Sequence, residues 1–196
     1  MIKLTNIKFK YLLILSLIII LCSILIYSKS NTELEYNEAI GGDFALTNQY
    51  GVINTLDSFK NKYSLIFFGF TNCDMICPTS LNNMSLLYNK LSKKQKDNLN
   101  MIFVTIDPQR DNPERLKQYL ANFSAPITGL TGSKKAINLV KENYKIYAQK
   151  ADIGQNKLTI NHSSFIYLLN KEGKFIDHVG HDFEIDMLYD KLNNIL

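Results

Sequence analysis

The chain contains no tryptophan, only three cysteines and only four prolines among its 196 residues. Three cysteines are too few for a small scaffold that is held together by disulfides. Without tryptophan, any aromatic platform must use tyrosine or phenylalanine. Hydrophobic residues make up 46% of the chain and charged residues 20%, a balance that excludes a disordered or fibrous protein. The length suits one globular domain rather than two.

Acidic residues are missing from the N-terminal segment, and this explains the net charge of +4. Residues 1–29 carry four lysines and no acid. The other 18 of the 22 basic residues therefore belong to the rest of the chain, where they balance its 18 acidic residues. A neutral body lacks the basic surface that binding to nucleic-acid phosphates requires. We therefore expect no nucleic-acid partner.

One long uncharged run lies near the N-terminus. Residues 11–27 are almost all leucine and isoleucine, and a helix of this length, at about 1.5 Å per residue, approaches the thickness of a bilayer core. Lysines precede the run and glutamates follow it, so the positive-inside rule leaves the N-terminus in the cytoplasm. We expect residues 1–29 to be a single-pass transmembrane anchor in a bacterial inner membrane and residues 30–40 to be a tether. Residues 41–196 are then a soluble domain that faces the periplasm.

Two alternatives to an uncleaved anchor stay open. A cleaved signal peptide needs a site with small residues after the apolar run, but residues 24–30 offer only bulky residues and serines. A lipid attached to Cys22 is the other alternative, although Leu21 is larger than the residue that usually precedes a lipoprotein cysteine.

Short apolar runs alternate with helical patterns through the rest of the chain. Runs such as YSLIFFGF at residues 63–70 are typical of strands that are buried on both faces. The order β-α-β-α-β-α-β-β-α predicts an α/β fold with a central mixed sheet of mainly parallel strands, flanked by helices. The final hairpin and helix are typical of a thioredoxin-like fold. The expected strands are residues 63–70, 101–106, 127–130, 164–169 and 174–179, and the expected helices begin near Pro78, Asn112, Ser133 and Glu184, the first of them ending near Lys94.

Two cysteines follow the first buried strand. Cys73 and Cys77 are four residues apart, a spacing that puts both sulfurs on one face of a first helical turn, with Cα atoms roughly 6 Å apart. A helix N-terminus also favours the thiolate form. The pair then suits disulfide exchange or a soft metal ion, while buried packing and a structural disulfide remain alternatives.

A histidine completes a candidate metal site. His162 precedes the strand at residues 164–169, which we expect beside the strand that leads to Cys73, so a loop there can bring the imidazole over the thiolates. Two thiolates and an imidazole suit copper(I). All four prolines precede the third expected strand, so the cis-proline of thioredoxin-type oxidoreductases is missing near His162, which favours a ligand-bearing loop. We interpret His178 and His181 as solvated surface groups.

Six runs occur in order along the body: Ile40-Gly41-Gly42-x-Phe44-x-Leu46, Tyr63-Ser64-Leu65-Ile66-Phe67-Phe68-Gly69-Phe70-Thr71, Cys73-x-x-x-Cys77-Pro78, Asp107-Pro108-x-Arg110-Asp111-x-Pro113, Gly129-Leu130-Thr131-Gly132 and His162-Ser163-Ser164-Phe165-Ile166-Tyr167-Leu168. Together they resemble the Sco/SenC family of copper-binding cytochrome c oxidase assembly proteins. The resemblance implies a thioredoxin-like fold with one copper ion, Cu(I) or Cu(II), bound by Cys73, Cys77 and His162. It also implies a role in building the binuclear copper centre of cytochrome c oxidase subunit II, with that subunit and a copper donor protein as partners.

The chain departs from the family pattern around these ligands. Asn72 replaces the usual histidine before the first cysteine, Asp74-Met75-Ile76 replaces Pro-Asp-Ile, and Asn161 replaces the aspartate before the histidine. These changes leave the ligands in place and alter their surroundings. Met75 is either a fourth soft ligand or a residue that packs within the loop, and we expect packing.

Two functions from different classes follow. In the first, the protein is a copper metallochaperone, a binding protein rather than an enzyme, that assists assembly of the copper centre of subunit II. In the alternative, it is a membrane-anchored thiol–disulfide reductase whose Cys73/Cys77 pair keeps the cysteines of that subunit reduced for copper insertion. His162 separates the two, because metal binding needs it and disulfide exchange does not. A thiol peroxidase is disfavoured, since the sequence lacks a Pro-x-x-x-Thr-x-x-Cys segment.

Overall fold

The computed structural model describes residues 14–24, 40–152 and 158–196. The chain divides into two units, residues 1–39 and residues 40–196. In the first unit, residues 14–24 form a helix, and the remainder of the apolar run at residues 11–27 lies outside the described part, as does nearly all of the expected tether. No helix within the described ranges is long and apolar enough to cross a membrane.

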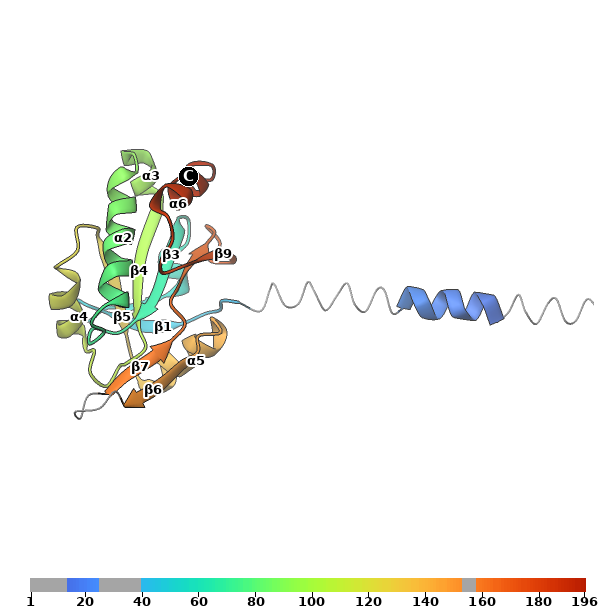
Figure 1. Cartoon of the computed structure of the whole chain (residues 1–196), viewed down its shortest axis with the longest axis horizontal. Helices are drawn as coiled ribbons and strands as arrows, with labels where there is room; N and C mark the ends of the chain where they lie inside the picture. The colour runs from blue at the N-terminus through green and yellow to red at the C-terminus, as the bar shows by residue number, and fades with distance from the viewer. Residues whose placement is uncertain (1–13, 25–39, 153–157) are drawn as a thin grey trace, which may run out of the picture. The chain divides into compact units, whose positions relative to one another are not determined.

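The second unit is built on a mixed seven-stranded sheet (Figure 1), which confirms the expected α/β class. In spatial order its strands are β2 (Ile53–Thr55), β1 (Ala45–Asn48), β5 (Ile127–Thr131), β4 (Leu99–Thr105), β3 (Tyr63–Gly69), β8 (Phe165–Leu169) and β9 (Phe175–Gly180). Strands β3, β4 and β5 run parallel at its centre, and β8 and β9 form the expected antiparallel hairpin beside β3. The β1–β2 hairpin, which the sequence analysis did not predict, pairs with β5.

Helical segments lie between these strands and after the last of them. They are η1 (Leu56–Phe59), α2 (Ile76–Lys90), α3 (Lys93–Asp97), α4 (Pro113–Leu120), α5 (Lys134–Asn143) and α6 (Ile185–Asn193). The side chains of Asn112 and Ser133 accept hydrogen bonds from the first turns of α4 and α5, as helix caps do. The helix expected to reach Lys94 ends earlier, because Ser92 and Gln95 form a capping box that starts α3.

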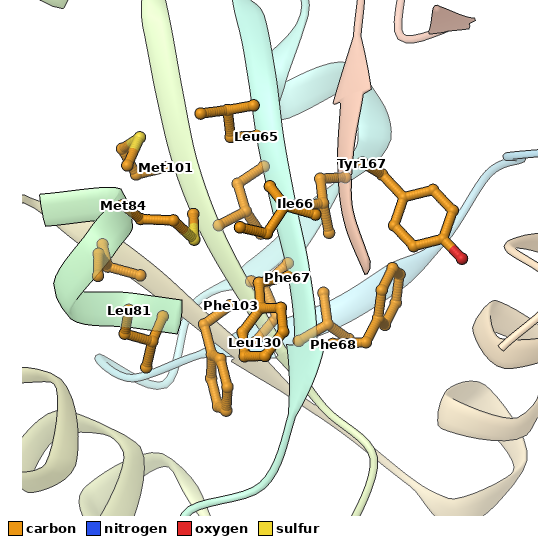
Figure 2. Packing of buried hydrophobic residues seen from close by; sticks show 14 of the residues in the cluster. Leu65, Ile66, Phe67, Phe68, Leu81, Met84, Met101, Phe103, Leu130 and Tyr167 are labelled. Carbon is orange, nitrogen blue, oxygen red and sulfur yellow. The ribbon is translucent and has the colours of Figure 1, made fainter. Parts of the chain in front are cut away.

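The core lies on both faces of β3, at the centre of the sheet (Figure 2). All but the first residue of this strand are buried, as an apolar run without alternation predicts for a strand covered on both sides. Phe67 contacts Phe103 of β4, with ring centroids 6.2 Å apart. Phe68, on the opposite face, contacts Tyr144 and Tyr167 at 5.2 and 5.6 Å. This packing fixes the end of β3, where the candidate site begins.

A separate two-stranded sheet carries the candidate histidine. Its strands, β6 (Ala148–Asp152) and β7 (Leu158–His162), pair antiparallel. The sequence analysis predicted a loop before β8, and this prediction is wrong, since His162 is the last residue of β7 and is paired with Ala148. Backbone hydrogen bonds of a strand therefore determine where the histidine lies.

Candidate functional site

The two cysteines meet where β3 passes into α2. Cys73 lies before the helix, with its backbone N–H donating to the Phe70 carbonyl at 3.3 Å, and Cys77 is the second residue of α2. The expectation that both occupy the first helical turn is therefore wrong for Cys73. Instead, the Cys77 backbone N–H donates to the Cys73 sulfur at 3.3 Å, so this sulfur acts as a capping oxygen does in other helices. The two cysteines form no disulfide in the structure.

Gly69, the last residue of β3, leaves room for the second sulfur. A Cβ atom at this position would lie 2.8 Å from the Cys77 Sγ and 2.9 Å from a ring carbon of Phe103. The Cys77 side chain is 0% exposed, so it has no free space into which to move. A residue without a side chain is therefore needed where the sulfur approaches the strand.

The two thiols differ in acidity although they are in contact. The hydrogen bond that the Cys77 thiol donates lowers the pKa of Cys73 to about 4, against the opposing effect of burial and with a smaller contribution from the His162 imidazole. The same hydrogen bond, together with burial, raises the pKa of Cys77. At neutral pH Cys73 is therefore the thiolate of the pair, and Cys77 keeps its proton.

His162 approaches the same sulfurs with one ring nitrogen free. Its Nε2 lies 3.9 Å from the Cys77 Sγ, and its ring packs edge-on against Phe70 with centroids 5.8 Å apart. The Nδ1 atom lies 2.7 Å from the carbonyl oxygen of Ser163, and because a carbonyl only accepts, Nδ1 carries the proton. In the neutral ring Nε2 therefore offers its lone pair toward the cysteines. The structure thus brings His162 and both cysteines together.

These three side chains fit a soft metal ion in kind, and one of the distances between them fits such an ion as well. Sulfur and nitrogen ligands at about 2.3 and 2.0 Å from one ion lie roughly 3.5–4 Å apart, and the distance from Cys77 to His162 falls in this range. Thiolate and imidazole are the donors that copper and zinc prefer. In their present arrangement, no three His, Cys, Asp or Glu side chains of the described residues are placed to hold a metal ion. A metal would take the place of the proton between the two sulfurs, which requires the sulfurs to readjust.

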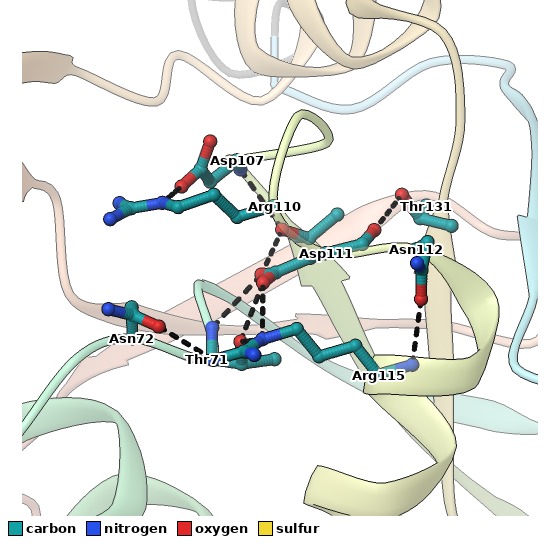
Figure 3. Close-up of polar contacts among 9 residues, drawn as sticks. Thr71, Asn72, Asp107, Arg110, Asp111, Asn112, Arg115 and Thr131 are labelled. Atoms are coloured by element: carbon teal, nitrogen blue, oxygen red, sulfur yellow. Dashed lines mark hydrogen bonds and ion pairs between the residues drawn. The ribbon is translucent and has the colours of Figure 1, made fainter.

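A buried carboxylate holds the loop that carries Cys73 (Figure 3). Asp111 is 0% exposed, and its carboxylate accepts hydrogen bonds from the Thr71 N–H and hydroxyl at 2.9 and 2.6 Å and from the Thr105 hydroxyl at 2.7 Å. Its backbone carbonyl accepts from the Thr131 hydroxyl at 2.7 Å. These bonds tie the loop after β3 to the ends of β4 and β5.

Arg115 joins the same loop to α4 (Figure 3). Its Nε donates to the Thr71 hydroxyl and its Nη2 donates to the side-chain oxygen of Asn72, both at 2.6 Å. The guanidinium also lies 3.7 Å from the Asp111 carboxylate. Asn72 is one of the departures from the family pattern, and its amide oxygen gives the arginine an acceptor next to Cys73. This departure therefore connects the residue before the thiolate to α4.

A second ion pair borders the site from the loop after β4. Asp107 is buried and pairs with Arg110, whose guanidinium lies 5.9 Å from the centroid of the Phe70 ring. The same ring contacts His162, so Phe70 touches both this ion pair and the imidazole. The sequence analysis quoted this run only for its resemblance and gave it no role. A role for this run could have been inferred from its position, because it directly follows a buried parallel strand and lies next to the end of β3.

The remaining candidate residues lie elsewhere or differ from expectation. His178 is exposed, as expected, and belongs to β9, where its ring contacts Phe165 with centroids 4.7 Å apart. His181 follows β9 and is half-buried. Met75, which the sequence analysis expected to pack within the cysteine loop, is 75% exposed, so that expectation is wrong.

Comparisons with known proteins agree with this fold. Residues 32–196 match the SCO1/SenC family. The SCO2-like protein RC0895 of Rickettsia conorii is 43% identical over 146 residues, which are 74% of this chain and 71% of that protein. The structure of Bradyrhizobium japonicum ScoI with copper bound has a TM-score of 0.74 and 37% identity, and the match covers 81% of this chain and 100% of that one.

A third similar protein is BsSco, a member of the Sco family of cytochrome c oxidase assembly proteins in which a disulfide switch has been identified. Its structure has a TM-score of 0.63 and 26% identity, over 80% of this chain and 93% of that one. These structures confirm the expected thioredoxin-like fold of the second unit. Because the family match extends over most of its length, the chain belongs to the SCO1/SenC family.

Proposed function

We propose that this protein is a copper metallochaperone that binds one copper ion through Cys73, Cys77 and His162 and passes it to subunit II of cytochrome c oxidase. The observation that carries the proposal is the 3.9 Å approach of the His162 Nε2 to the Cys77 sulfur, beside the Cys73 thiolate. The copper bound by B. japonicum ScoI supports the choice of metal, and the assembly role of the Sco family supports the target. Two sulfurs and one imidazole favour Cu(I).

Each of the three residues has its own task in this function. Cys73, already a thiolate, offers its lone pair at once, whereas Cys77 must release its proton, so copper binding releases a proton at neutral pH. The hydrogen bond from His162 to Ser163 keeps the lone pair of Nε2 directed at the cysteines. Copper is the cargo, and it leaves without a change of oxidation state when sulfur or imidazole donors of the partner replace these ligands.

Titration of the reduced full-length chain with Cu(I), in competition with a coloured chelator, tests the proposal. We expect one equivalent of copper per chain, a loss of affinity in single variants of Cys73, Cys77 and His162, and wild-type binding by the control variant His178→Ala. If His162→Ala binds copper like the wild type, the three-ligand site is wrong.

A second candidate function is a thiol–disulfide reductase that keeps the cysteines of subunit II reduced. The observation that favours it is the contrast between a half-buried thiolate at Cys73 and a fully buried, protonated thiol at Cys77. In this reaction the Cys73 thiolate attacks the partner's disulfide and forms a mixed disulfide. Cys77 then loses its proton and displaces the partner's thiolate, leaving Cys73 and Cys77 as a disulfide and the partner as a dithiol. The test is reduction of a disulfide-bonded fragment of subunit II, a reaction that His162→Ala should retain and Cys73→Ser should lose.

The setting that suits either function is the outer face of a bacterial inner membrane. We propose that residues 1–29 anchor the chain by one transmembrane pass, that residues 30–40 are a tether, and that the copper-binding domain at residues 41–196 faces the periplasm. The support is the apolar run, preceded by lysines and followed by glutamates. Cell fractionation with a carbonate wash tests this location. Release of the full-length chain into the supernatant contradicts the anchor.

A further inference from the structure

Met75 is the most exposed large apolar side chain of the described residues, and it lies between the two cysteines. It is 75% exposed, whereas the Cys77 side chain is 0% exposed. Met75 is the residue before the first turn of α2 and makes no side-chain capping hydrogen bond. Neither core packing nor helix capping therefore explains this methionine.

The position in the chain puts a third sulfur-bearing residue two residues from each cysteine. The backbone of Met75 is one of the groups that lower the pKa of Cys73, the smallest of them, and Met75 is two residues from that thiolate in the chain. The unbranched side chain has three rotatable bonds, and it is 75% exposed. A thioether is a soft donor that binds Cu(I), and it has no proton to lose, so it is ready at any pH.

We infer that Met75 is the ligand to which Cu(I) moves on its way out of the site. The inference rests on the proposed copper function and adds to it how a partner gains access to the metal. Because Cys77 is enclosed by the core, an incoming ligand cannot approach from its side. An exposed thioether gives the ion a position nearer the surface while both thiolates still hold it.

The transfer step changes one ligand and no oxidation state. The bond from copper to the His162 Nε2 breaks as the bond from copper to the Met75 sulfur forms, and both cysteine thiolates stay bound. The imidazole keeps its lone pair when the copper leaves it. A donor atom of the partner then replaces the weak, uncharged thioether.

Transfer kinetics of the full-length chain test this inference. The reduced protein, loaded with one equivalent of Cu(I) without oxygen, is mixed with an excess of a coloured Cu(I) chelator, and the rate of transfer is recorded. Met75→Leu removes the sulfur and keeps the apolar bulk. The control is Met187→Leu, because Met187 is also exposed, at 54%, but lies on α6. We expect Met75→Leu to slow transfer about tenfold with little change in equilibrium affinity, and the control to transfer at the wild-type rate.

A second measurement uses the variant without the imidazole. In a His162→Ala background the thioether becomes the third ligand, so adding Met75→Leu should lower Cu(I) affinity about tenfold further. A wild-type transfer rate in Met75→Leu overturns the inference, and so does an equal slowing in Met187→Leu. A large loss of equilibrium affinity in Met75→Leu alone also overturns it, because Met75 would then be a permanent ligand. Failure of the wild-type chain to bind copper would instead show that the proposed function is wrong.

Discussion

The acidity of Cys73 leads to a prediction about its reactivity as the pH is lowered. A thiol with an ordinary pKa of about 8.5 loses most of its thiolate between pH 8 and pH 5, and its alkylation slows several hundredfold. The hydrogen bond from Cys77 lowers the pKa of Cys73 to about 4, so the thiolate of Cys73 persists over this whole interval. We therefore expect the alkylation rate of Cys73 in the reduced, metal-free chain to stay nearly constant from pH 8 to pH 5.

The absolute alkylation rate of Cys73 is less informative than its dependence on pH, because two effects on that rate oppose each other. At pH 7, Cys73 has about thirtyfold more thiolate than an ordinary thiol. A thiolate of lower pKa is also a weaker nucleophile, and with a Brønsted coefficient of about 0.4–0.5 the difference slows it roughly a hundredfold. Cys73 should then react about threefold more slowly than an ordinary thiol at pH 7, and about thirtyfold faster at pH 5, where few ordinary thiols are ionised.

The assay is timed alkylation with iodoacetamide, followed by mass spectrometry that distinguishes Cys73 from Cys77. The reference is Cys73 in the same chain, unfolded in guanidinium chloride, which should slow about tenfold per pH unit. Cys77→Ala is the matched variant, since it removes the strongest cause of the low pKa and should restore part of that slope. A tenfold fall per pH unit for Cys73 in the folded wild type would refute the hydrogen-bond argument.

Three further predictions concern single positions. His162→Ala should lower Cu(I) affinity at least about 10–100-fold in chelator competition, and His178→Ala should leave that affinity unchanged. Gly69→Ala should lower the free energy of unfolding in urea by about 1–3 kcal/mol, because its Cβ would lie 2.8 Å from the Cys77 sulfur, and an unchanged midpoint would contradict this. Tyr144→Phe should raise that free energy by about 1 kcal/mol, because the buried Tyr144 hydroxyl has no hydrogen-bond partner among the described residues; a lower midpoint would argue for an unseen partner.

The strands of the main sheet could be predicted because their physical signal is strong. A central strand that is covered on both faces has to be mainly apolar, and β3 and β4 are such strands. The β1–β2 hairpin gave no comparable signal, since most of its residues are exposed or half-buried and its strands are only four and three residues long. Pairing with β5, which is distant in sequence, determines β1, and a local pattern cannot reveal such pairing.

The loop that carries Cys73 shows a second case in which rules based on local sequence do not predict the structure. A spacing of four residues predicted one helical turn for both cysteines, yet α2 begins only at Ile76. Helix-capping rules are based on oxygen-bearing side chains, whereas here the sulfur of Cys73 accepts the backbone N–H of Cys77. The hydrogen bonds from Thr71 to Asp111 then hold the loop across 40 residues of sequence. Contacts between residues so far apart in sequence depend on the folded sheet. The candidate ligands could therefore be predicted from the sequence, but the residues that position them could not.

The β6–β7 hairpin positions the histidine mainly through its backbone. Ala148 pairs with His162, and the next residues continue the connection, since the Ser163 N–H donates to the Tyr147 carbonyl at 3.0 Å and the Tyr147 N–H donates to the Ser163 hydroxyl at 3.1 Å. Backbone pairing places few demands on side-chain type, so β6 and β7 need no apolar run. Their sequences therefore cannot be distinguished from that of a loop. The same Ser163 carbonyl that follows His162 accepts its Nδ1 proton, which turns Nε2 toward Cys77. The orientation of the metal-facing nitrogen therefore depends on strand register, and a one-residue slip of β7 would turn the imidazole to the other face of the hairpin.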